Sequence, residues 1–240
     1  MTPPDTPYPT RQLPLGVQLA VTHRFETFHE GPNREAVAAL ARLVAEAAGP
    51  PLWLHGPPGS GRSHLLQAAC ARAGESGLTA AYLPLAAARA ADPAMLAGFE
   101  RLGLVALDDV DAIAGHAGWE RALFSLWNEL AAERGRLVLA ARAPPAALPF
   151  GLPDLASRLC ASEVHRLQAL GEAEQAEALA RRARHRGLEL PPDTLAYLTR
   201  RAPRDFAALC RLLDALDSES LAAQRRLTVP FVREWLSRAG

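Results

Sequence analysis

The sequence predicts an α/β protein in which a parallel sheet domain is followed by a small all-helical domain. Short apolar runs alternate with helical stretches over the first two-thirds of the chain, a glycine-rich loop joins one such run to a helix, and only helical patterns follow residue 168. Apolar strands that alternate with helices form parallel sheets covered on both faces. We therefore expect a flexible tail over residues 1–20, an α/β domain over 21–167 and a helical domain over 168–240.

The first domain reads as alternating strands and helices. Val37, Leu40 and Val44 recur at helical spacing behind Asn33, a residue type that favours the N-cap, and a second helix is expected to stop at Gly74. The apolar runs predict strands at 51–56, 80–85, 102–110 and 135–142. In the second domain, helical patterns predict helices at 172–187, 192–202, 204–224 and 228–239.

Composition indicates a globular, cytoplasmic protein. The chain is 49% hydrophobic with a formal net charge of zero, which gives no global attraction to nucleic acid or to a membrane. Three widely spaced cysteines, Cys70, Cys160 and Cys210, are expected to be reduced, buried thiols. Residues 1–20 lack the apolar core of a signal peptide, and no apolar stretch reaches the ~18 residues of a membrane span.

The loop "GPPGSGRS", residues 56–63, nearly fits the phosphate-binding pattern G-x-x-x-x-G-K-[ST]. Between a strand and a helix, such a loop turns main-chain N–H groups and a helix N-terminus toward a phosphate, and the Ser63 hydroxyl would bind Mg²⁺. Arg62 stands where the pattern has lysine, and all 26 basic residues of the chain are arginine. The planar guanidinium keeps the charge but changes its geometry, so we expect phosphate binding with impaired hydrolysis. The alternative is an ordinary glycine-proline turn.

A second motif, "LVALDDVD" at residues 104–111, ends a buried strand in carboxylates. Asp108 would lie at Mg²⁺, directly or through a second shell, at the carboxyl edge of the sheet. Asp109 occupies the place where active hydrolases keep a glutamate base, which is one methylene longer. The alternative is an acidic strand-to-helix turn, and we interpret Asp111 as a helix cap of this kind.

Five segments together resemble the AAA+ module of the bacterial replication initiator DnaA and, more closely, the DnaA-related Hda family of regulatory inactivators. The resemblance runs from about residue 11 to the end of the sequence, and it implies an AAA+ P-loop sheet domain followed by a helical lid. The segments are "RFETFHEGPNREAVAAL" (24–40), "GPPGSGRSHLLQAAC" (56–70), "LVALDDVDAIAG" (104–115), "GLPDLASRL" (151–159) and residues 186–236.

The resemblance implies a bound nucleotide, ADP or another nucleoside diphosphate, with Mg²⁺ possible at Ser63 and Asp108. Phosphate contacts would come from Gly59, Ser60, Gly61, Arg62 and Ser63, and base and ribose contacts from Phe28, Gly31 and Asn33. Without the resemblance, Phe28 would be an ordinary core residue. Arg204 resembles the second sensor, which reaches from the lid to the phosphates.

Arg158 resembles the arginine finger of the family, which acts in trans on the ATP bound by DnaA. Without the resemblance it would be an exposed arginine at a helix end. The chain departs from the family at Ala140, Ala141 and Arg142, where a polar first sensor is usual. Together with Arg62 and Asp109, this departure leads us to expect slow ATP turnover by the chain itself.

The segment "QLPLG", residues 12–16, resembles the peptide that docks on the sliding clamp, the β subunit of DNA polymerase III. Gln12 would enter a polar subsite while Leu13 and Leu15 fill an apolar groove, although so short a motif also occurs by chance. The resemblance thus implies a negative regulator of replication initiation whose partners are DnaA and the clamp on DNA. Whether two copies of the chain form a homodimer stays open.

Two other functions stay open at this stage: an autonomous AAA+ ATPase of the helicase-loader type, and a non-catalytic adaptor that binds DnaA. No helix-turn-helix segment follows residues 228–239 in this sequence, so we expect no sequence-specific DNA binding by that route.

Overall fold

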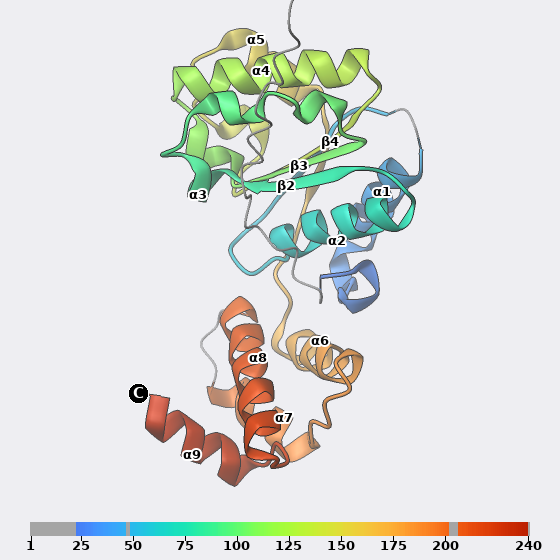
Figure 1. Ribbon diagram of the computed structural model, residues 1–240. Helices are drawn as coiled ribbons and strands as arrows, with labels where there is room; N and C mark the ends of the chain where they lie inside the picture. Colours follow the sequence, from blue (N-terminus) through green and yellow to red (C-terminus); the bar gives the residue numbers. More distant parts are fainter. Residues whose placement is uncertain (1–22, 47–48, 202–205, 240) are drawn as a thin grey trace, which may run out of the picture.

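The computed structural model describes residues 23–46, 49–201 and 206–239. Figure 1 shows a sheet covered by helices on both faces, with a separate group of helices below it. Within the described residues, the sheet has five strands in the order β2-β3-β4-β1-β5, and every pair is parallel. This confirms the predicted α/β class. The strands are β1 (Leu52–His55), β2 (Ala80–Pro84), β3 (Leu104–Asp108), β4 (Arg136–Ala141) and β5 (Glu163–Arg166).

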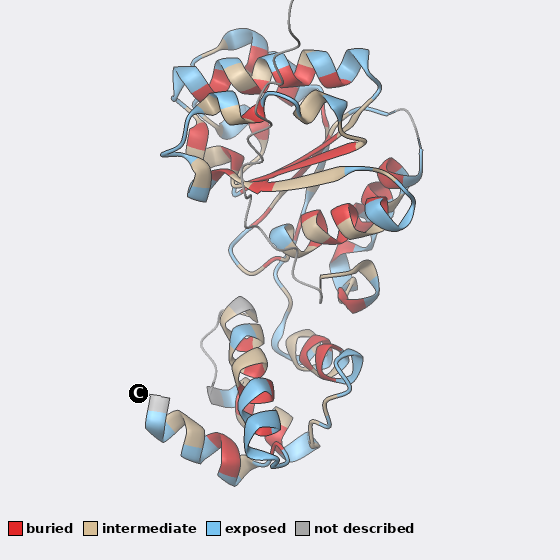
Figure 2. Ribbon diagram, in the orientation of Figure 1, coloured by how far each residue is buried: buried red, intermediate tan, exposed pale blue. Residues whose placement is uncertain are grey.

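The central strands are apolar because helices cover both of their faces. Every residue of β3 is buried, and β4 is buried from Leu137 to Ala141 (Figure 2). β5 was not predicted. It is an edge strand of sequence Glu-Val-His-Arg whose residues alternate between half-buried and exposed, so it lacks the apolar run that marks an inner strand.

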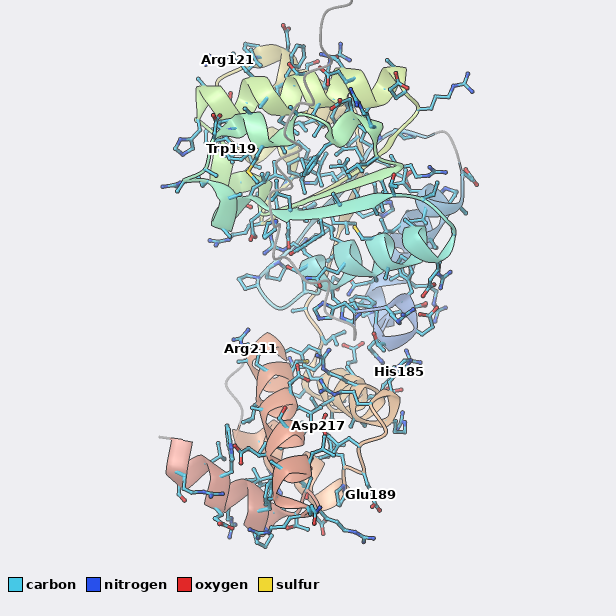
Figure 3. All side chains as sticks on the ribbon, in the orientation of Figure 1. Trp119, Arg121, His185, Glu189, Arg211 and Asp217 are labelled. Carbon is cyan, nitrogen blue, oxygen red and sulfur yellow. The ribbon has the colours of Figure 1, made fainter. Side chains whose placement is uncertain are left out.

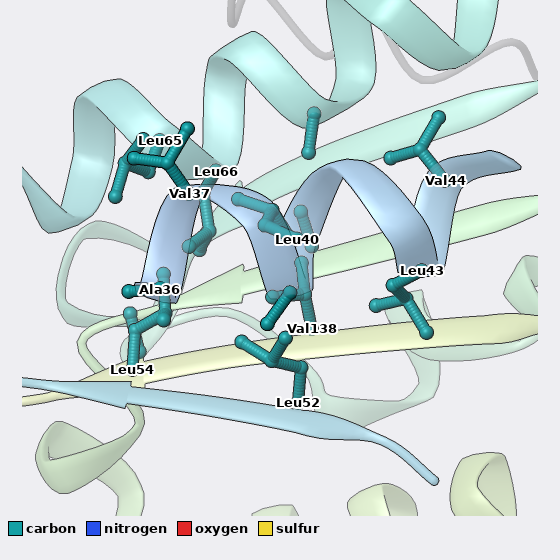
Figure 4. Close-up of a cluster of buried hydrophobic side chains, with 14 of the residues drawn as sticks. Ala36, Val37, Leu40, Leu43, Val44, Leu52, Leu54, Leu65, Leu66 and Val138 are labelled. Carbon is teal, nitrogen blue, oxygen red and sulfur yellow. The ribbon is translucent and has the colours of Figure 1, made fainter. Parts of the chain in front are cut away.

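Two helices, α1 (Arg34–Ala45) and α2 (Arg62–Glu75), cover one face of the sheet. Leu40 of α1 packs among apolar side chains of β1, β4 and α2 (Figure 4). Both helices were predicted, α1 from the spacing of its apolar residues. However, α2 continues past Gly74 to Glu75, and Gly77 takes the left-handed conformation that follows the helix, with φ of +78°.

The opposite face carries α3 (Leu85–Ala88), α4 (Ala117–Ala132) and α5 (Pro153–Cys160). Buried Glu120 of α4 joins two loops on this side, because its carboxylate accepts main-chain N–H bonds from Gly115 (2.7 Å), Gly151 (3.0 Å) and Leu152 (2.8 Å). Leu152 is the residue before α5. Glu120 therefore fixes the start of α5. Short 3-10 turns lie at Phe25–Thr27, Gly31–Asn33, Pro93–Leu96, Phe99–Arg101, Val110–Ile113 and Pro145–Ala147.

The helical domain packs around its own apolar core, which includes Leu179, Leu198, Leu213 and Phe231. A short connection leads from β5 to this domain, and the predicted boundary between residues 167 and 168 stays a prediction. Across the residues that the structure describes, no helix combines the length and the apolar character needed to cross a membrane. The helices are α6 (Glu172–His185), α7 (Pro192–Arg201), α8 (Phe206–Ala223) and α9 (Val229–Ala239).

The expectation that all three cysteines are buried is confirmed for Cys70 alone. Cys70 is buried in α2 and Cys210 is half-buried in α8, whereas Cys160 is exposed. Cys160 ends α5, which turns Leu155 and Leu159 into the core and leaves Asp154, Arg158 and Cys160 exposed. Apolar side-chain type alone did not reveal which face of this short helix would be outward.

Candidate nucleotide-binding site

The glycine-rich loop connects β1 to α2, as its sequence predicted. Gly59 and Gly61 take φ values of +79° and +93°, which residues with side chains rarely adopt. A Cβ on Gly61 would also lie 2.5 Å from the Phe28 ring, so only glycine allows this close approach. The loop thus brings its main chain and the N-terminus of α2 to one point, which is the geometry that binds phosphate.

The Arg62 side chain leaves the loop at the first residue of α2 and brings its guanidinium near Asp109. The side chain is only 11% exposed, and its Nη1 has no hydrogen-bond partner within the described structure. The Ser60 hydroxyl is likewise buried without a partner there. Buried polar atoms are normally satisfied, since an unmade hydrogen bond is unfavourable by about 1–3 kcal/mol. A phosphate group carries the negative charge and the acceptor oxygens that would satisfy the Arg62 guanidinium, whereas the Ser60 hydroxyl lies beside Gly56 and does not line the cavity that Arg62 lines.

The acidic motif lies next to the loop. Asp108 is buried, and its carboxylate accepts hydrogen bonds from the Tyr82 hydroxyl (2.8 Å) and from the Asp109 main-chain N–H (2.9 Å). The side chains of Ser63 and Gln67 also interact with the Tyr82 hydroxyl. Tyr82 therefore bridges the two motifs, and sequence reasoning missed it because an aromatic residue in a strand reads as core.

Hydroxyl and carboxylate oxygens such as those of Ser63 and Asp108 suit Mg²⁺, which prefers hard oxygen ligands. Among the described residues, no group of three or more His, Cys, Asp or Glu side chains could hold a metal ion. The two side chains therefore fit a magnesium ion only if nucleotide phosphates or water supply most of its ligands.

Asp109 pairs with Arg62 across 3.9 Å and has a left-handed backbone, with φ of +51°. Burial, reinforced by the nearby Asp108, raises the pKa of the Asp109 carboxyl, and Arg62 opposes that rise. The interpretation of Asp111 as a helix cap is wrong. Its carboxylate instead accepts from the Arg142 main-chain N–H (3.2 Å) and pairs with the Arg142 guanidinium, linking the ends of β3 and β4.

Phe28 and the neighbouring turn form the other side of the site. The Phe28 ring meets the His64 ring edge-on, with ring centres 5.3 Å apart. Burial lowers the pKa of His64 to about 3, so the ring is neutral near pH 7. Its Nε2 lies 2.9 Å from the Arg24 carbonyl oxygen, to which it donates. His64 thus ties the Phe28 segment to the phosphate-loop helix.

Two adjoining cavities lie between this segment, the loop and the lid. The first is lined in part by Phe28, His29, Leu170 and Ala178. The second has a volume of about 330 Å³ and is lined in part by Arg62, Ser63, Arg211 and Asp214. Both are also lined by Gly59, Gly61, His64, Arg182, Phe206 and Cys210. Figure 3 shows Arg211 at the end of α8 that approaches the sheet domain. An apolar compartment therefore adjoins a cationic one.

The structure brings most of the predicted site residues together, but not all. Gly31 and Asn33 do not line the two cavities. The Asn33 side chain does not cap α1 and instead forms two hydrogen bonds with the main chain of Gln168, of 3.0 and 2.8 Å. A Cβ on Gly31 would lie 3.0 Å from the Glu174 carboxylate. Both positions therefore contact the lid or the chain that leads to it. Arg204, Gln12, Leu13 and Leu15 lie outside the described residues.

Arg182 of α6 lines both cavities, and sequence reasoning missed it. The available signal was the i,i+4 pair Arg182 and Arg186 in α6 with the i,i+3 pair Asp214 and Asp217 in α8. These spacings predict one charged face on each helix. They do not predict that one end of the faces reaches a ligand cavity.

Arg158 lies away from this site. It is exposed on α5, does not line either cavity, and its guanidinium carbon stands 5.5 Å from the centre of the Phe124 ring of α4. Stacking on an aromatic face holds a guanidinium in place while leaving its edge accessible. The arginine is thus available to a group outside this chain.

Comparisons with known proteins agree with this geometry. Residues 19–89 match the bacterial DnaA ATPase domain, and residues 172–236 match the lid domain of Hda. Domain III of the replication initiation protein DnaA from Thermotoga maritima is similar over 92% of this chain and 98% of that chain, with a TM-score of 0.76 and 21% identity.

Two further solved structures share the fold. AMPPCP-bound DnaA from Aquifex aeolicus is similar over 83% of this chain and 66% of that chain, with a TM-score of 0.65 and 21% identity. The Thermotoga maritima RuvB Holliday junction branch migration motor is similar over 89% of this chain and 72% of that chain, with a TM-score of 0.62 and 16% identity. The parallel sheet, phosphate loop and helical lid form the AAA+ P-loop fold that these structures share. The two family matches show that residues 19–89 are related to DnaA and residues 172–236 to Hda.

Proposed function

We propose that this protein is a nucleotide-bound negative regulator of replication initiation. It docks on the sliding clamp on DNA and stimulates DnaA to hydrolyse the ATP that DnaA carries, which prevents re-initiation. Such a regulator works in the cytoplasm. The observation that carries the proposal is the position of Arg158, which is exposed, held on Phe124 and remote from the protein's own nucleotide cavities.

The proposed chemistry at Arg158 is electrostatic. When a γ-phosphoryl group is transferred to water, negative charge spreads over its oxygens and the leaving group. A guanidinium placed against these oxygens stabilises the transition state more than the ground state, and its planar fork can bind two oxygens at once. Arg158 would supply this group from one protein to the ATP site of another.

The chain's own site is proposed to hold ADP or another nucleoside diphosphate. The buried Arg62 Nη1 supports phosphate binding, since it has no partner among the described residues and a phosphate in the second cavity would satisfy it. Phe28 and Ala178 give the adjoining cavity an aromatic and apolar lining for a base, which would enter only if this cavity, of about 50 Å³, widened on binding. Gly31 and Asn33 would act through the turn that carries Phe28. Mg²⁺ would be held by the phosphates with Ser63 and Asp108, and Arg204 would add a contact from the lid.

Slow hydrolysis by the chain itself is proposed on three grounds. Arg62 and Asp109 are 3.9 Å apart, so the candidate base is paired with the cation that should serve the phosphates. Ala140 and Ala141 end β4 without a polar side chain, and Arg142 is paired with Asp111. The protein therefore has a nucleotide cradle with few groups suited to activating water.

The clamp contact is proposed for Gln12, Leu13 and Leu15, in the part of the chain that precedes the described residues. An extended peptide binds through main-chain hydrogen bonds and a few anchoring side chains, and a glutamine followed by leucines supplies both a polar and an apolar anchor. Tethering to the clamp would restrict DnaA inactivation to DNA on which replication has begun.

The experiment that tests this function measures conversion of DnaA-bound ATP to ADP. It compares DnaA alone with DnaA plus this protein, the clamp and DNA, and then omits each component in turn. The proposal expects acceleration that needs the protein and clamp-loaded DNA together. Brisk ATP turnover by the isolated chain would instead support a helicase-loader-like ATPase, and binding to DnaA without acceleration would support an adaptor.

A further inference from the structure

The lid carries a row of alternating charges that begins at the nucleotide cavities. Arg182 donates through Nε (3.2 Å) and Nη2 (2.8 Å) to the two carboxylate oxygens of Asp214. Arg186 then contacts both Asp214 (2.6 Å) and Asp217 (2.9 Å). Figure 3 shows Asp217 further along α8 than Arg211, away from the sheet domain. The row therefore runs from the cavity outward along α6 and α8.

Arg182 is the member of this row that borders both cavities, and it is only 8% exposed. Burial lowers the pKa values of His23 and His64, and the charge of Arg182 lowers both further, while Asp214 opposes this effect at His23, so the Arg182–Asp214 pair acts on the phosphate-loop side. The second cavity is also bordered by Arg62, Ser63 and Arg211. An anion in this cavity would therefore meet cations from both domains.

We propose that Arg182 is a phosphate ligand supplied by the lid, and that Asp214 sets its strength by neutralising part of its charge. This inference rests on the proposed nucleotide binding. It adds Arg182 as a ligand and Asp214 as the residue that tunes the affinity. The ligand class is a nucleoside diphosphate, and the contact is made to its phosphates. Nucleotide binding then joins the lid to the phosphate loop through Arg62 on one side and Arg182 on the other.

The shared carboxylate makes this contact feasible. If Arg182 shifts toward a phosphate, Asp214 keeps Arg186 as its partner, so no partly buried carboxylate is left alone. Asp217 in turn holds the other side of Arg186. Asp214 also borders the second cavity, where its negative charge repels a diphosphate. Its removal should therefore strengthen phosphate binding, whereas removal of Arg182 should weaken it.

The test measures binding of ADP and of inorganic pyrophosphate to the full chain by calorimetry. Arg182→Gln should weaken binding of both probes by roughly ten- to hundredfold, as expected for a lost charge-assisted contact. Arg182→Lys, which keeps the charge, should fold normally. Its affinity for each probe should lie between that of wild type and that of Arg182→Gln. Asp214→Asn keeps an acceptor oxygen for Arg182 but removes the charge, so binding should tighten by roughly twofold to fivefold.

A matched control uses the Arg225–Glu234 pair, a 2.9 Å contact on the lid that borders neither cavity. Arg225→Gln and Glu234→Gln should leave both affinities within about twofold of wild type. The inference is overturned if Arg182→Gln and Arg182→Lys bind like wild type, or if Asp214→Asn weakens or does not change binding, as a purely structural pair would require. If the wild-type chain binds neither probe, the proposed nucleotide site itself fails.

Discussion

Replacement of Glu120 by alanine should strongly destabilise the sheet domain. The Glu120 side chain is only 1% exposed, and its carboxylate is the acceptor for three main-chain N–H groups, those of Gly115, Gly151 and Leu152. Each buried donor left without an acceptor is unfavourable by about 1–3 kcal/mol. Water entering the vacated space would satisfy part of this need, so we expect the free energy of unfolding to fall by about 3–5 kcal/mol.

Glu120→Gln provides a graded comparison. Its carbonyl oxygen can still accept from Gly115 and Gly151, which share Oε1, while its NH₂ group would face the Leu152 N–H at the start of α5. The expected loss is about 1–2 kcal/mol. This variant therefore separates the hydrogen bond at the start of α5, which carries Arg158, from the two bonds that Oε1 accepts.

Urea unfolding followed by tryptophan fluorescence measures these losses. Glu129→Ala, on the exposed side of the same helix, should change the free energy of unfolding by less than about 0.5 kcal/mol. A loss below about 1 kcal/mol for Glu120→Ala would refute the reasoning, because it would mean that the three N–H groups do not depend on this carboxylate. Three of the four tryptophans report on the sheet domain: Trp53, Trp119 and Trp127.

Three further predictions use independent measurements. Replacing Gln12 and Leu13 with alanine should reduce clamp affinity by a large factor without changing thermal unfolding. Unchanged affinity would mean that this segment does not bind the clamp. The purified chain should bind ADP yet turn over ATP very slowly, and brisk turnover would show that the Arg62–Asp109 pair does not impair the site. Burial lowers the pKa of His64 to about 3, below its ordinary 6.5, so the unfolded chain binds the proton more readily and stability should fall as the pH drops from 6.5 toward 3. Urea unfolding across this pH range should show a smaller loss of stability for His64→Gln than for wild type. An equal loss in the variant would mean that His64 does not cause the fall.

The fold was largely predictable because its inner elements carry strong periodic signals. β3 is a continuous apolar run ending in Asp108, and α1 shows Leu40 and Val44 at helical spacing. β5 escaped prediction because an edge strand half in solvent has no such run. The extent of α2 was also misjudged, since a helix tolerates Gly74 near its end when packing supports it.

The site was predictable only where a local motif encodes it. The loop from Gly59 to Ser63 fixes its own geometry, so its residues lie together as expected. Tyr82 and Arg182 reach the site from a strand and from the lid, and only the tertiary arrangement brings them there. Asn33 illustrates the opposite case, because a good N-cap residue is used for a long-range contact with Gln168 instead.

The central claim is tested most directly by the rate at which DnaA-bound ATP becomes ADP on clamp-loaded DNA with Arg158→Ala. An arginine supplied in trans contributes roughly 10³–10⁵ in rate in well-characterised nucleotide switches, so acceleration should collapse while ADP and clamp binding stay normal. Arg158→Lys should restore little, because the planar fork is lost. Arg121→Ala, an exposed arginine of α4, should stimulate like wild type (Figure 3). Full stimulation by Arg158→Ala would contradict the account and favour a protein that only tethers DnaA.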